Sequence, residues 1–177
     1  MSDLIWGNPE TVVSAPSKVE PKFATKANEL SVGLGANLRL EVGVGPSSAL
    51  QVLAFRVPIL VSNHQRLVGY VQDLTFGVQR SPGTRIVIVA ELAGALKTSE
   101  YDFQNATDPP QNDSMIITRF FSPQGLERAG GGSLGLYGPV SDYFATIKCA
   151  IERRSINDFG AVGIDALDVV PILISEG

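Results

Sequence analysis

The side chains that most often act as nucleophile or base are one histidine, His64, and one cysteine, Cys149. A Ser-His-Asp or Cys-His site would have to include His64. This histidine lies in a polar stretch at residues 62–65, which favours a solvated loop position. Cys149 falls on the apolar face of a regular alternating pattern, which is typical of a small core residue. One histidine and one cysteine cannot form a zinc site, which needs several such ligands.

A polar stretch at residues 97–114 carries four carboxylates, Glu100, Asp102, Asp108 and Asp113. Their oxygens could bind Ca²⁺, although the spacing is not that of an EF-hand. A pair of carboxylates could also hydrolyse glycosides, because the fold and not the sequence spacing brings such a pair together. Neither alternative is singled out by the residues, and we expect no metal and no cofactor.

A glycine-rich stretch, AGGGSLGLYGP at residues 129–139, is the remaining pattern associated with ligands. It lacks the Lys-Ser/Thr pair and the following helix of a phosphate-binding loop, so it is interpreted as a loop. With no motif for catalysis, we expect a protein that is not an enzyme.

The elements that position these residues are β-strands. Residues 66–80 alternate between apolar and polar side chains, and residues 86–90 form a β-branched apolar run. The intervening Ser81-Pro82-Gly83 is a turn sequence. We expect a hairpin whose return strand is central in its sheet and covered on both faces. Further strands are predicted at residues 37–44, 50–61, 115–121, 141–153 and 164–174. Strands at this spacing predict an all-β, antiparallel sandwich of about eight strands, of jelly-roll type.

The first 30 residues differ in character from the rest, with three prolines and little periodicity. We predict an extended N-terminal arm at residues 1–30, with a short helical piece near residues 24–30, and a β-sandwich domain at residues 31–177. Leu4, Ile5, Trp6 and Phe23 are the candidate residues through which the arm contacts a neighbouring subunit. The alternative is that Trp6 folds back onto its own core.

Composition excludes several classes of protein. With 44% hydrophobic and 18% charged residues among 177, the chain can bury a substantial core, and its single cysteine excludes an intrachain disulfide. The net charge is −4 and the arm is nearly neutral, so strong binding to nucleic acid is not expected. The sequence lacks a transmembrane segment and a signal peptide, which predicts a cytoplasmic site of synthesis without secretion.

The proline-containing arm, the sandwich and the two long loops together resemble the single jelly-roll capsid proteins of icosahedral viruses. The resemblance covers about residues 36–174. It implies eight strands in two facing sheets, a location in the virion, and association with copies of itself and with other virion proteins. Many capsid proteins that package RNA have a basic arm, and this chain departs from that pattern. A shell that does not package RNA through its arm fits the sequence better.

A carbohydrate- or ligand-binding β-sandwich is the alternative. Residues 162–169 look like the closing strand of carbohydrate-binding jelly rolls. The candidate contact residues are those of the two long loops, namely Tyr101, Asp102, Phe103, Asp108, Asp113 and Tyr137. An enzyme built on the same scaffold is the third class.

Overall fold

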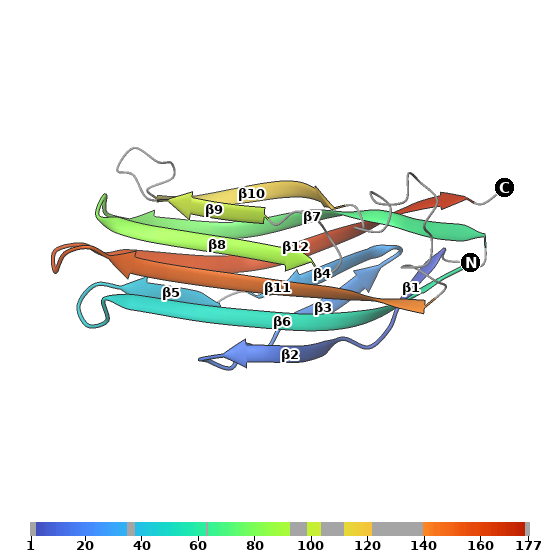
Figure 1. Cartoon of the computed structure of the whole chain (residues 1–177), viewed down its shortest axis with the longest axis horizontal. Coiled ribbons are helices and arrows are strands. Elements are labelled where there is room, and N and C mark those ends of the chain that lie inside the picture. The colour runs from blue at the N-terminus through green and yellow to red at the C-terminus, as the bar shows by residue number, and fades with distance from the viewer. Residues whose placement is uncertain are drawn as a thin grey trace.

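The structure, a computed structural model, describes residues 3–34, 38–62, 64–92, 99–103, 112–121 and 140–175. These residues contain twelve β-strands and no helix (Figure 1). The strands are β1 (Leu4–Trp6), β2 (Glu10–Ala15), β3 (Lys22–Lys26), β4 (Glu29–Gly33), β5 (Arg39–Val42), β6 (Ser48–Val61), β7 (Gln65–Arg80), β8 (Thr84–Leu92), β9 (Ser99–Phe103), β10 (Asn112–Phe121), β11 (Val140–Arg153) and β12 (Gly160–Ser175). No helix among the described residues is long and apolar enough to cross a membrane.

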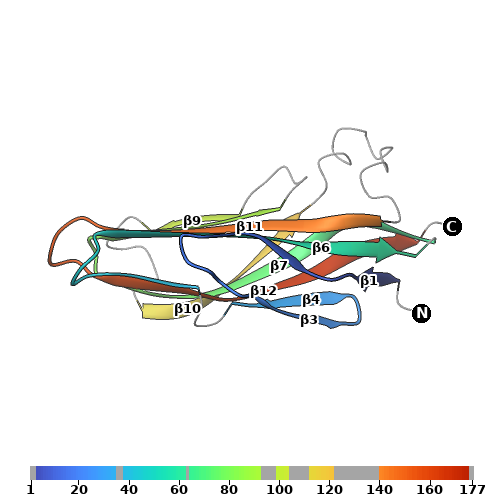
Figure 2. The same ribbon diagram turned by 90° about the horizontal axis from the view of Figure 1, so that it is seen from below.

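The strands form two antiparallel sheets that face each other (Figure 2). The β6 sheet has the order β6-β11-β8-β9, with β1 and β2 both paired to the free side of β6. The β7 sheet has the order β10-β7-β12-β4-β3, with β5 also paired to β12. Apolar side chains alternate inward along β4, β6, β7, β8, β11 and β12 and fill the space between the two sheets.

The path of the chain through the two sheets is that of a jelly roll. From β5 to β12, the chain changes sheet at every step except between β8 and β9. The order β5-β12-β7-β10 in one sheet therefore faces β6-β11-β8-β9 in the other, as two interleaved Greek keys require. The predicted antiparallel sandwich of jelly-roll type is confirmed, and β1 to β4 are added to its eight strands.

The hairpin predicted at residues 66–92 is wrong in its pairing. Both strands exist, but β7 and β8 belong to different sheets, and the turn at residues 81–83 carries the chain across the sandwich. The turn is tight, since the Thr84 N–H donates to the Ser81 carbonyl over 3.0 Å. As predicted, β8 is central, between β11 and β9. It is not covered on both faces, because Val87 and Val89 are only half-buried on the outer face.

The segment predicted as an extended arm is part of the sandwich. β1 and β2 run along β6 as one interrupted strand, joined where the Gly7 N–H donates to the Pro58 carbonyl over 2.7 Å. β3 and β4 form a hairpin on β12, so the short helix predicted near residues 24–30 is wrong. Leu30 and Val32 of β4 are core residues. An extended segment with alternating apolar residues satisfies its backbone by pairing with an open sheet edge.

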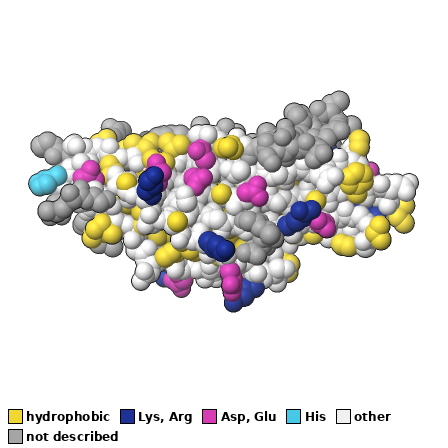
Figure 3. Space-filling view, turned by 180° about the vertical axis from the view of Figure 1, so that it is seen from behind, with side chains coloured by type: hydrophobic (Ala, Val, Ile, Leu, Met, Phe, Trp, Pro, Cys, Tyr) yellow, Lys and Arg dark blue, Asp and Glu magenta, His cyan; other side chains and the backbone are white. Residues whose placement is uncertain are grey.

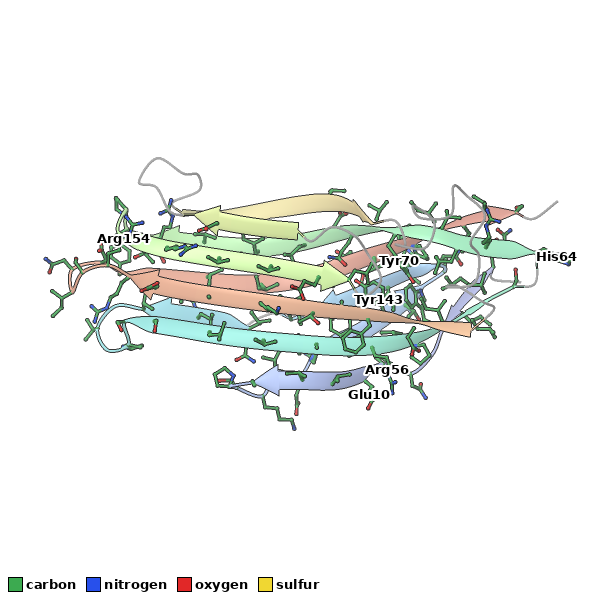
Figure 4. All side chains as sticks on the ribbon, viewed as in Figure 1. Glu10, Arg56, His64, Tyr70, Tyr143 and Arg154 are labelled. Carbon is green, nitrogen blue, oxygen red and sulfur yellow. The ribbon has the colours of Figure 1, made fainter. Side chains whose placement is uncertain are left out.

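Aromatic rings form the centre of the core. Tyr70 and Tyr143 lie face to edge with centroids 5.1 Å apart, and Phe55 lies 6.1 Å from Tyr143 (Figure 4). The Tyr143 hydroxyl donates to the Gln72 Oε1 atom over 2.6 Å, which joins β11 of one sheet to β7 of the other. Cys149 is buried in the same core, as predicted. Burial raises the pKa of its thiol to about 12.

Candidate assembly surfaces

Three of the four residues predicted to contact a neighbouring subunit pack inside their own chain. Leu4 is buried, and Phe23 lies edge-to-face on Phe55 with centroids 5.4 Å apart. The Trp6 indole N–H donates to the Asn28 carbonyl over 3.0 Å, and its ring packs edge-on against Tyr143. The structure therefore matches the alternative in which Trp6 folds back onto its own core. Ile5 is the member of this group that remains exposed, at 55%.

The predicted loop residues divide into three groups. Asp102 lies in β9 and accepts two hydrogen bonds from the Arg85 guanidinium, at 2.9 and 2.7 Å. The backbones of Tyr101 and Phe103 lie in β9, and that of Asp113 lies in β10. Asp108 and Tyr137 lie outside the described residues. Within the described ranges, no group of three or more His, Cys, Asp or Glu residues could hold a metal ion.

The structure shows an apolar cluster, not predicted from the sequence, on the turns at one end of the sandwich. Val44, in the turn between β5 and β6, is 110% exposed. Ile156 and Phe159, in the turn between β11 and β12, are 83% and 51% exposed. We call these three residues the loop tip. Figure 3 shows hydrophobic side chains gathered at the end opposite to His64. The strand predicted at residues 37–44 ends at Val42, so Val44 lies beyond it.

The loop tip is held by hydrogen bonds between its turns. The Arg153 guanidinium donates to the carbonyls of Ile156, at 2.9 Å, and Gly45, at 3.3 Å, so one side chain joins both turns. Asp158 accepts from the Ser81 hydroxyl at 2.9 Å and from the Ser155 N–H at 3.0 Å. The hydrogen bond from Ser81 is the main reason that the pKa of Asp158 lies below its ordinary value. The exposed apolar residues therefore lie on turns that hydrogen bonds join to neighbouring turns.

A second exposed apolar site lies on β2, at the margin of the β6 sheet (Figure 1). Within the described part of the chain, β2 pairs only with β6. Its central residues Val12 and Val13 are 47% and 41% exposed. Val12 has no partner on β6, because the register shifts between Thr11 and Val13. A β-bulge of this kind brings neighbouring side chains to one side of the strand.

Both ends of β2 are fixed to the body of the protein. Glu10 forms an ion pair with Arg56 of β6, visible at the lower margin of Figure 4. At the other end, the Ser14 hydroxyl donates to the Ser17 carbonyl at 2.7 Å and accepts from the Val19 N–H at 2.6 Å. The buried Gln51 amide accepts from the Ser17 N–H and donates to its carbonyl. The strand is therefore a fixed element of the sheet margin.

A shallow groove of about 460 Å³ crosses the outer face of the β6 sheet. Its floor is aliphatic, with Leu50, Val87 and Ala150 side by side on neighbouring strands. Arg85 and Glu152 border it, and none of the described residues that line it is aromatic. This chemistry fits an aliphatic contact better than the stacking of a sugar ring, which uses exposed aromatic faces.

No protein-family model matches the chain, and no curated protein matches it in sequence. Among solved structures, the chain is similar to TmCBM61 in complex with β-1,4-galactotriose, at 9% identity and a TM-score of 0.32, over 78% of this chain and 88% of that one. A structure of the infectious bursal disease virus Gt strain matches at 13% identity and a TM-score of 0.30, over 94% of this chain and 46% of that one. The family 11 carbohydrate-binding module from Clostridium thermocellum matches at 10% identity and a TM-score of 0.26, over 93% of this chain and 88% of that one. Likenesses this low assign neither a family nor a function.

Proposed function

We propose that this protein is a non-enzymatic structural subunit that assembles with copies of itself, and that the assembly is the shell of a virion. The supporting observation is the position of the exposed apolar residues. Val12 and Val13 lie on the sheet margin at β2, and the three apolar residues of the loop tip lie at one end of the sandwich, where another protein can reach them. The jelly roll serves both capsid and lectin domains, so the fold by itself does not select between them.

The positions of His64 and Cys149 support the non-catalytic part of this proposal. Cys149 lies in the core between the sheets, and its raised pKa, about 12, keeps the thiol protonated at neutral pH. His64 is exposed at the turn before β7, at one extreme end of the molecule (Figure 4). A nucleophile paired with a base needs the two groups within hydrogen-bonding reach.

The test is the state of the purified protein in solution. Native mass spectrometry and negative-stain microscopy, over a series of protein and salt concentrations, should show defined oligomers or closed particles. A single monodisperse monomer under every condition would overturn the proposal. Particles with a regular closed outline would support the virion shell, and a small fixed oligomer would support assembly while contradicting the shell.

The loop tip offers a matched pair of variants for the same assay. Ile156→Lys replaces an 83% exposed apolar side chain with a charge and should weaken assembly without changing the melting temperature. Asn157→Lys adds the same charge at the adjacent exposed position without removing apolar surface. If both variants weaken assembly equally, the effect comes from charge and the apolar contact at the tip is refuted.

The second candidate is a carbohydrate- or ligand-binding module, for which the groove on the β6 sheet offers a site for an aliphatic ligand. A glycan array probed with the purified protein should give specific binding in that case. Tyr101→Ala and Tyr137→Ala test the predicted loop aromatics, and Leu50→Arg tests the groove, whose floor it would fill. A silent array removes the carbohydrate reading.

A further inference from the structure

We infer that β2 is a self-association site, at which the β2 strands of two copies pair antiparallel about a two-fold axis and extend the β6 sheet from one copy into the other. This inference rests on the proposed self-assembly and names the surface and the partner, a second copy of this chain. It is carried by the position of β2, by the exposure of its central residues and by its sequence.

The position of β2 leaves one side of its backbone directed away from the sheet. An antiparallel strand offers N–H and C=O groups on both sides, and β6 takes up only one of them. Figure 1 shows β2 at the outer margin, beyond β6, with no other ribbon on its far side. Natural proteins commonly protect such a margin with lysines or prolines along the strand. The strand itself, ETVVSA, has neither, and its prolines stand outside it, at Pro9 and Pro16.

The sequence of β2 is complementary to itself in the centred two-fold register. In that register, Val12 lies opposite Val13 of the second copy, and Thr11 lies opposite Ser14. Glu10 lies opposite Ala15, so no like charges meet. Both valines of the central pair are exposed, and cross-strand pairs of β-branched residues stabilise antiparallel sheets. The interface is isologous, and it closes at two copies.

The same comparison rejects other strands at the sheet margins. Centred pairing of β3 would place Lys22 opposite Lys26, and centred pairing of β9 would place Glu100 opposite Asp102. Like charges directly opposite each other are destabilising. β1 and β5 have only three and four residues, so each could form few hydrogen bonds with a second copy. The remaining margin, β10, pairs Ile116 with Ile117 without like charges and is the rival that the experiment must exclude.

The bulge at Val12 limits what the contact can build. A bulge increases the local twist and interrupts the regular ladder, which discourages the stacking of many strands into a fibre. A six-residue ladder alone is also a small interface. We therefore expect a weak dimer that forms at high concentration or within a larger assembly.

The test is sedimentation velocity of the whole chain over a wide concentration range. The unaltered protein should show a dimer whose fraction rises with concentration. In Val12→Lys/Val13→Lys, four lysines meet at the two-fold axis, and the dissociation constant should rise at least about 10-fold. Ile116→Lys, on the rival margin, should leave it unchanged. Melting temperatures show whether the variants are folded, and both replace exposed side chains.

Cross-linking gives a second and independent measurement. Val12→Cys/Val13→Cys should form interchain disulfides on mild oxidation, because opposite residues in an antiparallel pair lie within bonding distance. Cys149 is buried and does not compete. Ile116→Cys should stay uncross-linked. If Val12→Lys/Val13→Lys still forms oligomers, or if only Ile116→Cys forms cross-links, the β2 contact is refuted while self-assembly remains supported. An unaltered protein that stays monomeric throughout would refute both.

Discussion

The hydrogen bond between Tyr143 and Gln72 provides a direct test of how the two sheets are joined. Both side chains are buried, and the hydroxyl donates across the core to the amide oxygen over 2.6 Å. Tyr143→Phe removes this donor while keeping the ring, so the edge-on contacts with Trp6 and Tyr70 persist. The Gln72 oxygen is then buried without this partner. A buried acceptor left unsatisfied costs about 1–3 kcal/mol of the free energy of unfolding.

For a chain of 177 residues, a loss of about 2 kcal/mol lowers the melting temperature by about 4–8 °C. Gln72→Met removes the acceptor with a side chain of similar length and should cost a comparable amount. The double variant removes both polar groups. It should lose less than the sum of the two single variants, with a coupling energy of about 0.5–3 kcal/mol.

The assay is urea unfolding followed by the fluorescence of Trp6, the only tryptophan, which packs against Tyr143. The dependence of the free energy on urea should be unchanged in all variants, since the surface exposed on unfolding is the same. Strictly additive losses would refute the reasoning, because they would show that the two groups do not act as a pair. A Tyr143→Phe variant as stable as the unaltered protein would refute it as well.

Three further outcomes are expected from charged and ionisable groups. Burial raises the pKa of Cys149 to about 12, from an ordinary 9.0, so the free energy of unfolding should fall as pH rises above about 9, by up to about 1.4 kcal/mol per pH unit. Cys149→Ala should flatten this slope in unfolding experiments between about pH 8 and 10. Because the pKa of Asp158 is lowered on folding, its carboxylate contributes to the free energy of unfolding above pH 3.8, its ordinary pKa, and this contribution is lost as pH falls through the pKa of the folded state. Asp158→Asn should speed hydrogen exchange at the Ser155 amide at neutral pH and leave the exchange of the core amides unchanged. Asp73 lies directly opposite Asp168 on the outer face of the β7 sheet, and two like charges opposite each other destabilise a sheet. Asp73→Asn should therefore raise the free energy of unfolding by about 0.2–1 kcal/mol. Salt screens charge repulsion, so a gain that does not shrink as salt is added would contradict this cause.

The strands and most of the core could be predicted because they depend on local alternation. The pattern around Cys149 identified an inward-facing strand position without any knowledge of its neighbours. Pairing depends on distant residues, and here the prediction failed. The turn at residues 81–83 has the same local chemistry whether the chain returns along the same sheet or crosses to the other. The N-terminal segment was likewise predicted as an arm because β6, its partner, is about 50 residues away in the chain.

The candidate surfaces were harder to predict than the fold. The strand predicted at residues 37–44 includes Val44, although β5 ends at Val42 and the turn that follows leaves Val44 exposed. The only available signal was the presence of large apolar residues, Ile156 and Phe159, among turn-forming neighbours. The exposure of Val12 and Val13 depends on a bulge, and no residue pattern marks its position.

The central place of β12 in the β7 sheet has a consequence for the timing of folding. Among the described strands, β12 comes last in the sequence, yet it separates β7 from β4 and β5, which precede it. Until residues 160–175 have left the ribosome, that sheet consists of two unconnected halves. Most contacts in the protein also join distant parts of the sequence, which is typical of slow folding. The completed sheet can therefore form only after β12 has been translated.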